Sequence, residues 1–286
     1  MNVRPQMTVA LLLWAGTVAP PRQTPTFSSR VEAVRVDVLV TQDGQPVRGL
    51  RPADFAIEDN GVPQQVDLVS SEQLPLNVIL TLDMSSSVAG EPLEHLRRAG
   101  RAVLDGLRTG DRAALITFSH VLAMGAPLTA DFGLVRRALD ASEAIGSTSL
   151  VDASYAGMVL GESDVGRSLV LVFSDGLDSA AWLSADEVLD IARRCDAVVY
   201  GVSAGQSPKS DFLADLSETT GGKLFKAEST KDLSAAFLSV LDEFRHRYVV
   251  SYSPRGVSPD GWHQLTVRVK GRNATVKARP GYFAGS

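Results

Sequence analysis

Nearly continuous apolar runs and alternating runs occupy different parts of this chain. The runs at 76–82 and 168–173 are almost uninterrupted, which is typical of parallel strands buried on both faces. Between and after these runs, the apolar residues recur with the spacing of amphipathic helices. The alternation of the two patterns predicts a doubly wound, mostly parallel α/β sheet with helices on both faces, over residues 75–247.

The same patterns predict the individual elements of this region. Strands are expected at 76–82, 113–118, 168–173, 197–202 and 223–225, with 121–128 as an antiparallel hairpin partner of the second strand. Helices are expected at 91–107, 132–141, 150–161, 185–194, 211–219 and 232–244. In sheets of this kind, ligands bind beyond the carboxyl ends of the strands, so the loops at that edge are where we look for a site.

The two ends of the chain show the period-two alternation of half-buried strands. This pattern is clearest at 34–40 and 265–269, and Asn60-Gly61 indicates a hairpin turn. Further short strands are expected at 55–57, 66–68, 248–252 and 275–279. Neither end is large enough to fold stably by itself. We therefore expect 29–74 and 248–286 to form one small β-sandwich-like module flanking the α/β region. The sequence leaves the pairing of the strands open.

The first residues have the features of an export signal. Arg4 precedes an apolar stretch at 7–19 that is too short to span a bilayer, and small residues at 17–19 suit cleavage. We therefore expect a signal peptide at 1–19, a leader at 20–28 and a periplasmic or extracellular location. A buried N-terminal helix is the alternative interpretation. The mature chain has no run of the roughly 20 apolar residues that a membrane span needs.

Composition narrows the possible functions. The 286 residues are 44% hydrophobic and 21% charged, which excludes wholesale disorder. The net charge of −5 and the lack of a long basic block argue against a nucleic-acid partner. Cys195 is the only cysteine, so an intramolecular disulfide and a cysteine-based zinc cluster are excluded. The four histidines are scattered, without the HExxH spacing of a zinc hydrolase.

Polar residues follow both of the apolar strands. Asp83-Met-Ser85-Ser86-Ser87 follows 76–82, and Ser174-Asp175-Gly176 follows 168–173. A third loop places the hydroxyl of Thr148 just before an expected helix. Because parallel strands end at the same edge of a sheet, we expect these loops to converge.

Carboxylate, hydroxyl and water oxygens suit a hard cation such as Mg²⁺ or Mn²⁺. Asp83, Ser85 and Ser87 can turn three oxygens inward, while Asp175 and Thr148 add two more from other loops. Only two of these five side chains carry a charge. If those two act partly through water, the ion keeps much of its positive charge and one open position, which an Asp or Glu of another protein could fill.

Asp83-x-Ser85-x-Ser87, with Thr148 and Asp175, resembles the metal-ion-dependent adhesion site of von Willebrand factor type A domains. The resemblance covers the whole α/β region, and the chain is similar to bacterial secreted VWFA-related proteins, a family expanded in Acidobacteria. It implies a Rossmann-type fold and an exported, non-enzymatic module for adhesion or protein binding. It also implies direct ligation of the ion by Ser85, Ser87 and Thr148, with Asp83 and Asp175 largely outside the direct ligand shell.

Other interpretations remain open at this point. The chain could be a structural subunit of an envelope assembly without a separate ligand, or the serines could merely cap a helix. Gly201-Val-Ser203-Ala-Gly205 matches the G-x-S-x-G pattern of serine hydrolases, for which Asp232 and His246 follow in permissible order. A Mg²⁺-dependent phosphatase would often carry a second carboxylate where Ser85 stands. Trp182 is expected either to border the metal site or to cover a helix.

Overall fold

In the computed structural model, the described residues are 33–70, 74–162, 165–205 and 211–285, all within one compact unit, Glu32–Ser286. The predicted signal peptide (1–19) and leader (20–28) lie outside the described residues. Among the helices that are described, none is both long and apolar enough to cross a lipid bilayer.

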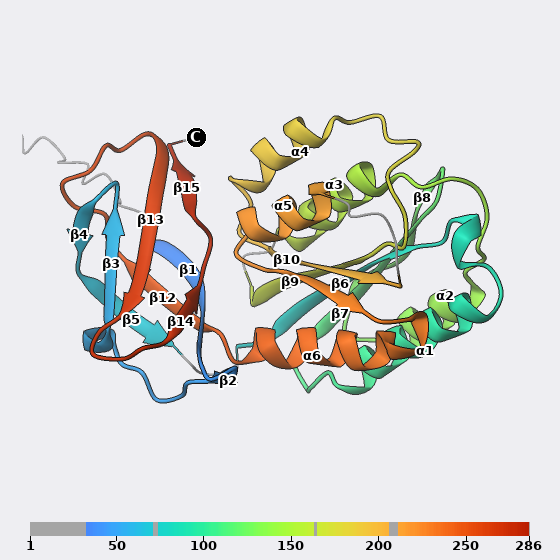
Figure 1. The fold of residues 1–286 in the computed structure, drawn as a ribbon, viewed down its shortest axis with the longest axis horizontal. Helices are drawn as coiled ribbons and strands as arrows, with labels where there is room; N and C mark the ends of the chain where they lie inside the picture. Colours follow the sequence, from blue (N-terminus) through green and yellow to red (C-terminus); the bar gives the residue numbers. More distant parts are fainter. Residues whose placement is uncertain (1–32, 71–73, 163–164, 206–210, 286) are drawn as a thin grey trace, which may run out of the picture. The chain divides into compact units, whose positions relative to one another are not determined.

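The α/β region is built on a six-stranded sheet with the order β11-β10-β9-β6-β7-β8 (Figure 1). The strands are β6 (Leu76–Asp83), β7 (Arg112–Phe118), β8 (Leu122–Thr129), β9 (Arg167–Phe173), β10 (Val198–Ala204) and β11 (Leu224–Ala227). Neighbouring strands are parallel except for the antiparallel pair β7–β8. All eight residues of β6 are buried, as the apolar run predicts for a central strand. The predicted fold class is confirmed.

Helices cover both faces of this sheet (Figure 1). They are α1 (Glu91–Asp105), α2 (Phe132–Ala141), α3 (Leu150–Gly161), α4 (Ala185–Ala192), α5 (Asp211–Thr219) and α6 (Leu233–Arg245), with short 3-10 helices at Pro52–Asp54, Ser86–Val88 and Thr230–Asp232. α1, α2 and α6 pack on one face, around a core that includes Leu96 and Phe237. α3, α4 and α5 pack on the other, around a core that includes Met158 and Leu213. The sheet is therefore a rigid support for the loops at its edges.

Both ends of the chain form one β-sandwich-like module, as expected. Its strands are β1 (Val34–Gln42), β2 (Gln45–Pro46), β3 (Phe55–Asp59), β4 (Val62–Gln64), β5 (Val66–Ser70), β12 (Tyr248–Tyr252), β13 (Gly261–Val269), β14 (Thr275–Lys277) and β15 (Gly281–Ala284). One sheet has the order β14-β1-β12-β5, with β2 on β1, and the other has the order β15-β13-β3-β4. Strands from the two chain ends are neighbours in both sheets, and their apolar faces enclose a shared core that includes Val36, Phe55 and Val250. Neither end could bury these side chains without the other.

Some element boundaries differ from the predicted ones. α1 ends at Asp105 rather than 107, because Gly106 follows and caps the helix. The strand expected at 275–279 ends at Lys277, and a further strand, β15, follows Pro280. β14 pairs with β1 while β15 pairs with β13, so the chain changes sheets at this proline, which cannot donate a ladder hydrogen bond.

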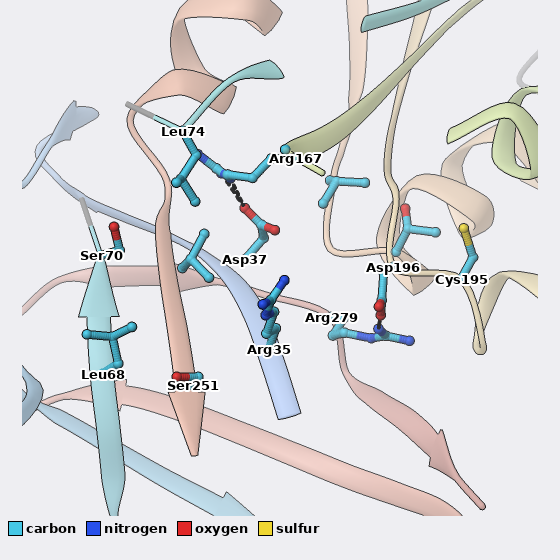
Figure 2. A pocket seen from close by; sticks show the side chains of 14 residues that line it. Arg35, Asp37, Leu68, Ser70, Leu74, Arg167, Cys195, Asp196, Ser251 and Arg279 are labelled. Carbon is cyan, nitrogen blue, oxygen red and sulfur yellow. Dashed lines mark hydrogen bonds and ion pairs between the residues drawn. The ribbon is translucent and has the colours of Figure 1, made fainter. Parts of the chain in front are cut away.

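The two modules are joined at the amino ends of β9 and β10. Arg167 Nε donates to Asp37 Oδ1 at 2.8 Å, and Arg279 Nη1 donates to Asp196 Oδ1 at 3.0 Å. Figure 2 shows both pairs in the wall of a cavity of about 360 Å³, with Arg35 between them. The buried arginines of this cavity are thus paired within its wall. The predicted metal-site residues lie at the opposite edge of the α/β sheet.

Candidate metal centre

Asp83 is the last residue of β6, and both of its carboxylate oxygens accept hydrogen bonds. The amide of Ser85 donates to Oδ1 at 2.8 Å, and the hydroxyl of Ser174 donates to Oδ2 at 2.7 Å. The Asp83 side chain is fully buried. The Met84 amide still donates to Phe118 O of β7 at 2.6 Å, and the chain then leaves the sheet and enters the 3-10 helix at Ser86–Val88. The carboxylate is thereby fixed in position at the carboxyl edge of the sheet.

A chain of hydroxyl groups connects Asp83 to the second carboxylate. The Oγ atoms of Ser85 and Ser87 are 2.9 Å apart, and Ser87 Oγ donates to Asp175 Oδ1 at 2.7 Å. Ser85 is buried, Asp175 is half-buried and Ser87 is exposed. Four of the five predicted residues therefore form one hydrogen-bonded group that runs from the interior to solvent.

Thr148, the fifth residue, is buried in a loop attached to the other two loops. The Ser86 amide donates to Gly146 O, and the Gly146 amide donates to Ser86 Oγ, both at 2.9 Å. The Ser179 amide donates to Thr148 O at 2.8 Å, and the Thr148 amide donates to Ser179 Oγ at 3.1 Å. A methyl group added at Gly176 would lie 3.9 Å from Thr148 Oγ1. The Thr148 hydroxyl therefore lies beside the loop that carries Asp175.

Two more acidic residues hold the loop that follows β9. Asp178 Oδ2 accepts from the amide of Val151 at 2.8 Å, in the first turn of α3. Asp152 accepts from the amides of Trp182 (3.0 Å) and Leu183 (2.9 Å). Carboxylates suit this place because the first amides of a helix lack partners in the helix. The Trp182 side chain is 94% exposed, so it does not cover a helix.

The electrostatics of the site favour a cation. Burial raises the pKa of Asp83, and the charge of Asp175 raises it further, while hydrogen bonds from Ser174 and Ser85 lower it. Among the described residues, Asp83 takes part in no ion pair with a lysine, arginine or histidine. A buried carboxylate without a positive partner is unfavourable unless a cation compensates it. A divalent ion would do so, and the residues present fit one.

The donor set also bears on which cation fits. No group of three or more His, Cys, Asp or Glu side chains suited to a metal occurs among the described residues. The available donors are instead hydroxyl oxygens and two carboxylates, which are ligands of hard cations such as Mg²⁺ and Mn²⁺.

Ser174 is a site residue to which sequence reasoning gave no role. Leu82 pairs with Phe173 where β6 and β9 run in parallel, so the next residues, Asp83 and Ser174, leave the sheet side by side. Only the register of β6 and β9 could have indicated this contact, because the register determines which polar residues meet after two neighbouring parallel strands. The register itself is not visible in the sequence.

The serine-hydrolase residues are not brought together. Ser203 lies within β10, paired with Lys226, rather than on a turn. Asp232 and His246 flank opposite ends of α6, about 20 Å apart at 1.5 Å per residue. His246 Nε2 instead lies 2.5 Å from Arg48 Nη2.

Comparison with known proteins identifies the α/β region. The family described as von Willebrand factor type A domain matches residues 78–177, a stretch that runs from β6 past Asp175. The chain contains a von Willebrand factor type A domain. The match includes all five predicted metal-site residues.

Solved type A domain structures share this fold. Proximal thread matrix protein 1 of the mussel byssus, in a structure with a zinc-occupied MIDAS motif, is 16% identical, with a TM-score of 0.54 over 65% of this chain and 49% of that chain. A von Willebrand factor type A protein from Catenulispora acidiphila is 13% identical, with a TM-score of 0.54 over 85% of this chain and 75% of that one. At these identities the likeness shows the fold alone.

One curated relative shares a short segment. An uncharacterized protein of Synechocystis sp. is 44% identical over 48 residues, which make up 17% of this chain and 11% of that protein. The match thus spans about a tenth of that relative, and the mussel match spans about half of its chain.

Proposed function

We propose that this protein is an exported binding module that captures a carboxylate of a protein partner through a bound Mg²⁺ or Mn²⁺. The residues that would hold the ion are Asp83, Ser85, Ser87, Thr148 and Asp175. The observation that carries the proposal is the buried Asp83 carboxylate, which is linked through the Ser85 amide and the Ser85 and Ser87 hydroxyls to Asp175 and forms no ion pair with a basic residue of the described segments. Type A domains are typically non-enzymatic modules of protein–protein interaction, which agrees with this role.

The hydrogen bonds of the two carboxylates support a division of roles. Both oxygens of Asp83 already accept bonds, and Oδ1 of Asp175 accepts from Ser87. These acids are therefore suited to orient the hydroxyls and act on the ion through them or through water. With neutral hydroxyls as the direct ligands, the ion keeps a strong attraction for an incoming carboxylate. The partner would approach from the exposed Ser87 side.

The choice of metal follows from the oxygen donors. Hydroxyl and carboxylate ligands favour Mg²⁺ and Mn²⁺ over ions that prefer nitrogen or sulfur. The zinc in the mussel protein structure supports a divalent ion at this motif in general, so Zn²⁺ belongs in the test as a competitor.

Calorimetric titration of the purified protein with Mg²⁺, Mn²⁺ and Zn²⁺ tests the site. We expect one ion per chain, loss of binding in Asp83→Ala, and an affinity at least about 10-fold weaker in Thr148→Val, which removes one hydroxyl at nearly constant shape. Thr266→Val makes the same change in β13 of the sandwich and should leave binding unchanged. Binding that persists in Asp83→Ala would disprove the assignment.

Chelation separates the binding module from a scaffold. In an affinity capture from the producing cells, a partner held through the ion should be lost with EDTA and with Asp83→Ala. An assembly subunit without a separate ligand should keep its contacts in both cases. The export step is tested by locating the mature N-terminus of the protein secreted by those cells, which we expect near residue 20.

A further inference from the structure

Large apolar side chains are exposed on the loops around the candidate metal site. Their exposed fractions are 94% for Trp182, 64% for Ile145, 59% for Val121 and 51% for Leu177. Single exposed apolar residues are ordinary on a protein surface. These four residues, however, lie on loops that meet at one edge of the sheet, and we call them together the apolar rim.

Two residues of the apolar rim are fixed to the loops that carry Ser85 and Thr148. The amide of Ile145 donates to Met84 O at 2.7 Å, between Asp83 and Ser85. Ser119 connects Val121 to the Thr148 loop, because its amide donates to Val121 O (3.0 Å) while its carbonyl accepts from Ser149 (2.9 Å). The backbones of both residues are therefore attached to the loops of the candidate site.

The other two residues lie on the loop that follows Asp175. Leu177 is two positions beyond that carboxylate. Trp182 is held through its amide by Asp152, only four residues after Thr148 on the chain. Because its backbone is fixed in this way, only the two side-chain torsions of Trp182 remain to be ordered when a partner binds. Tryptophans are among the residues that dominate binding energies.

We infer that the partner presents its acidic side chain next to aromatic or aliphatic residues, which bind the apolar rim, chiefly Trp182 and Leu177. The inference rests on the proposed function, since the acidic residue would occupy the metal site. A single carboxylate on an ion competes with water and with other anions and carries little selectivity. Apolar contacts beside it, with up to about 150–250 Å² from one tryptophan, would distinguish one acidic segment from another.

A phage library of nine-residue peptides with a central Asp or Glu and random flanks provides the probe. The full-length mature protein is panned in Mn²⁺ and again in EDTA, and selected peptides are measured by fluorescence anisotropy. We expect Mn²⁺-dependent peptides rich in Phe, Trp, Leu or Ile beside the acid. We also expect Trp182→Ser to weaken them at least about 10-fold. Leu238→Ser, at a 42%-exposed leucine on α6, is the matched control and should change the affinity less than about 2-fold.

The outcomes separate the inference from the proposed function. Mn²⁺-dependent peptides that lack apolar enrichment, or that bind Trp182→Ser as well as the unsubstituted protein, overturn the inference and leave the metal-dependent function standing. Recovery of no Mn²⁺-dependent peptide contradicts both. A Mn²⁺-independent dimer that Trp182→Ser dissociates in light scattering would show that a second copy of the chain covers the apolar rim, which also overturns the inference.

Discussion

The hydroxyl of Ser174 donates a 2.7 Å hydrogen bond to Oδ2 of the buried Asp83, and so joins the ends of β9 and β6 at the candidate metal centre. The bond fixes the carboxylate that in turn accepts from the Ser85 amide. In the proposed metal site, Ser174 would thus be a positioning residue that acts on the ion through Asp83.

Ser174→Ala should weaken Mn²⁺ binding about 10-fold, because Asp83 Oδ2 loses its donor and the carboxylate its orientation. The affinity can be measured by calorimetry or by the electron paramagnetic resonance of free Mn²⁺. Ser154→Ala is the control, since it also removes a buried hydroxyl, one that donates only to Leu150 O. Equal effects of the two substitutions would show that Ser174 has no specific role.

Asp83→Asn should have opposite effects with and without metal. Without metal, the amide removes an uncompensated buried charge, so the melting temperature should rise, by about 2–4 °C for each kcal/mol gained. In the unsubstituted protein, saturating Mn²⁺ should add about 2.7 kcal/mol at 100 times the dissociation constant. In Asp83→Asn this stabilisation should be absent. Differential scanning calorimetry with Mn²⁺ or EDTA gives all four values, and a lower melting temperature of metal-free Asp83→Asn would contradict the proposed electrostatics.

Arg167→Ala should destabilise the protein by about 2–4 kcal/mol, because it leaves Asp37 and the Phe244 carbonyl without their guanidinium partner. The two side chains of this ion pair are 5% and 19% exposed. Arg101→Ala breaks the exposed pair with Asp140 and should lower the free energy of unfolding by less than about 1 kcal/mol. Urea unfolding measures both, and equal effects would argue that Arg167 does not hold the two modules together.

Cys195 should react slowly with alkylating reagents in the native protein. Burial raises the pKa of its thiol to about 11, so about one thiol in a thousand is ionised at pH 8, and only the thiolate reacts. Iodoacetamide labelling followed by mass spectrometry should be at least about 100-fold slower than in denaturant. Rapid native labelling would show that the α4–β10 turn opens readily.

The Cys195 thiol should make the free energy of unfolding decrease at high pH. Its folded-state pKa lies above the ordinary value of 9.0, so the unfolded chain loses this proton first as the pH rises. The contribution of Cys195 to the free energy of unfolding is therefore constant below about pH 9 and decreases as the pH rises toward about 11. Cys195→Ala should remove this component of the pH profile.

The sequence by itself determined the class of the fold. An apolar run such as 76–82 is typical of a strand covered on both sides, and the alternation with helices leaves few topologies for such strands. Three of the five candidate ligands could also be proposed from the sequence, because Asp83, Ser85 and Ser87 are neighbours in the chain and follow such a strand directly. Local periodicity and spacing are enough for features of this kind.

Only the tertiary structure decided which distant residues meet. The role of Ser174 depends on the β6–β9 register, and the Arg167–Asp37 pair joins residues 130 positions apart. The pairing of β1 with both β12 and β14 likewise depends on which apolar faces bury each other. Trp182 is 94% exposed, and its amide is held by Asp152, 30 positions earlier in the chain. Such contacts depend on packing between segments far apart in the chain, and no local pattern of residues encodes them.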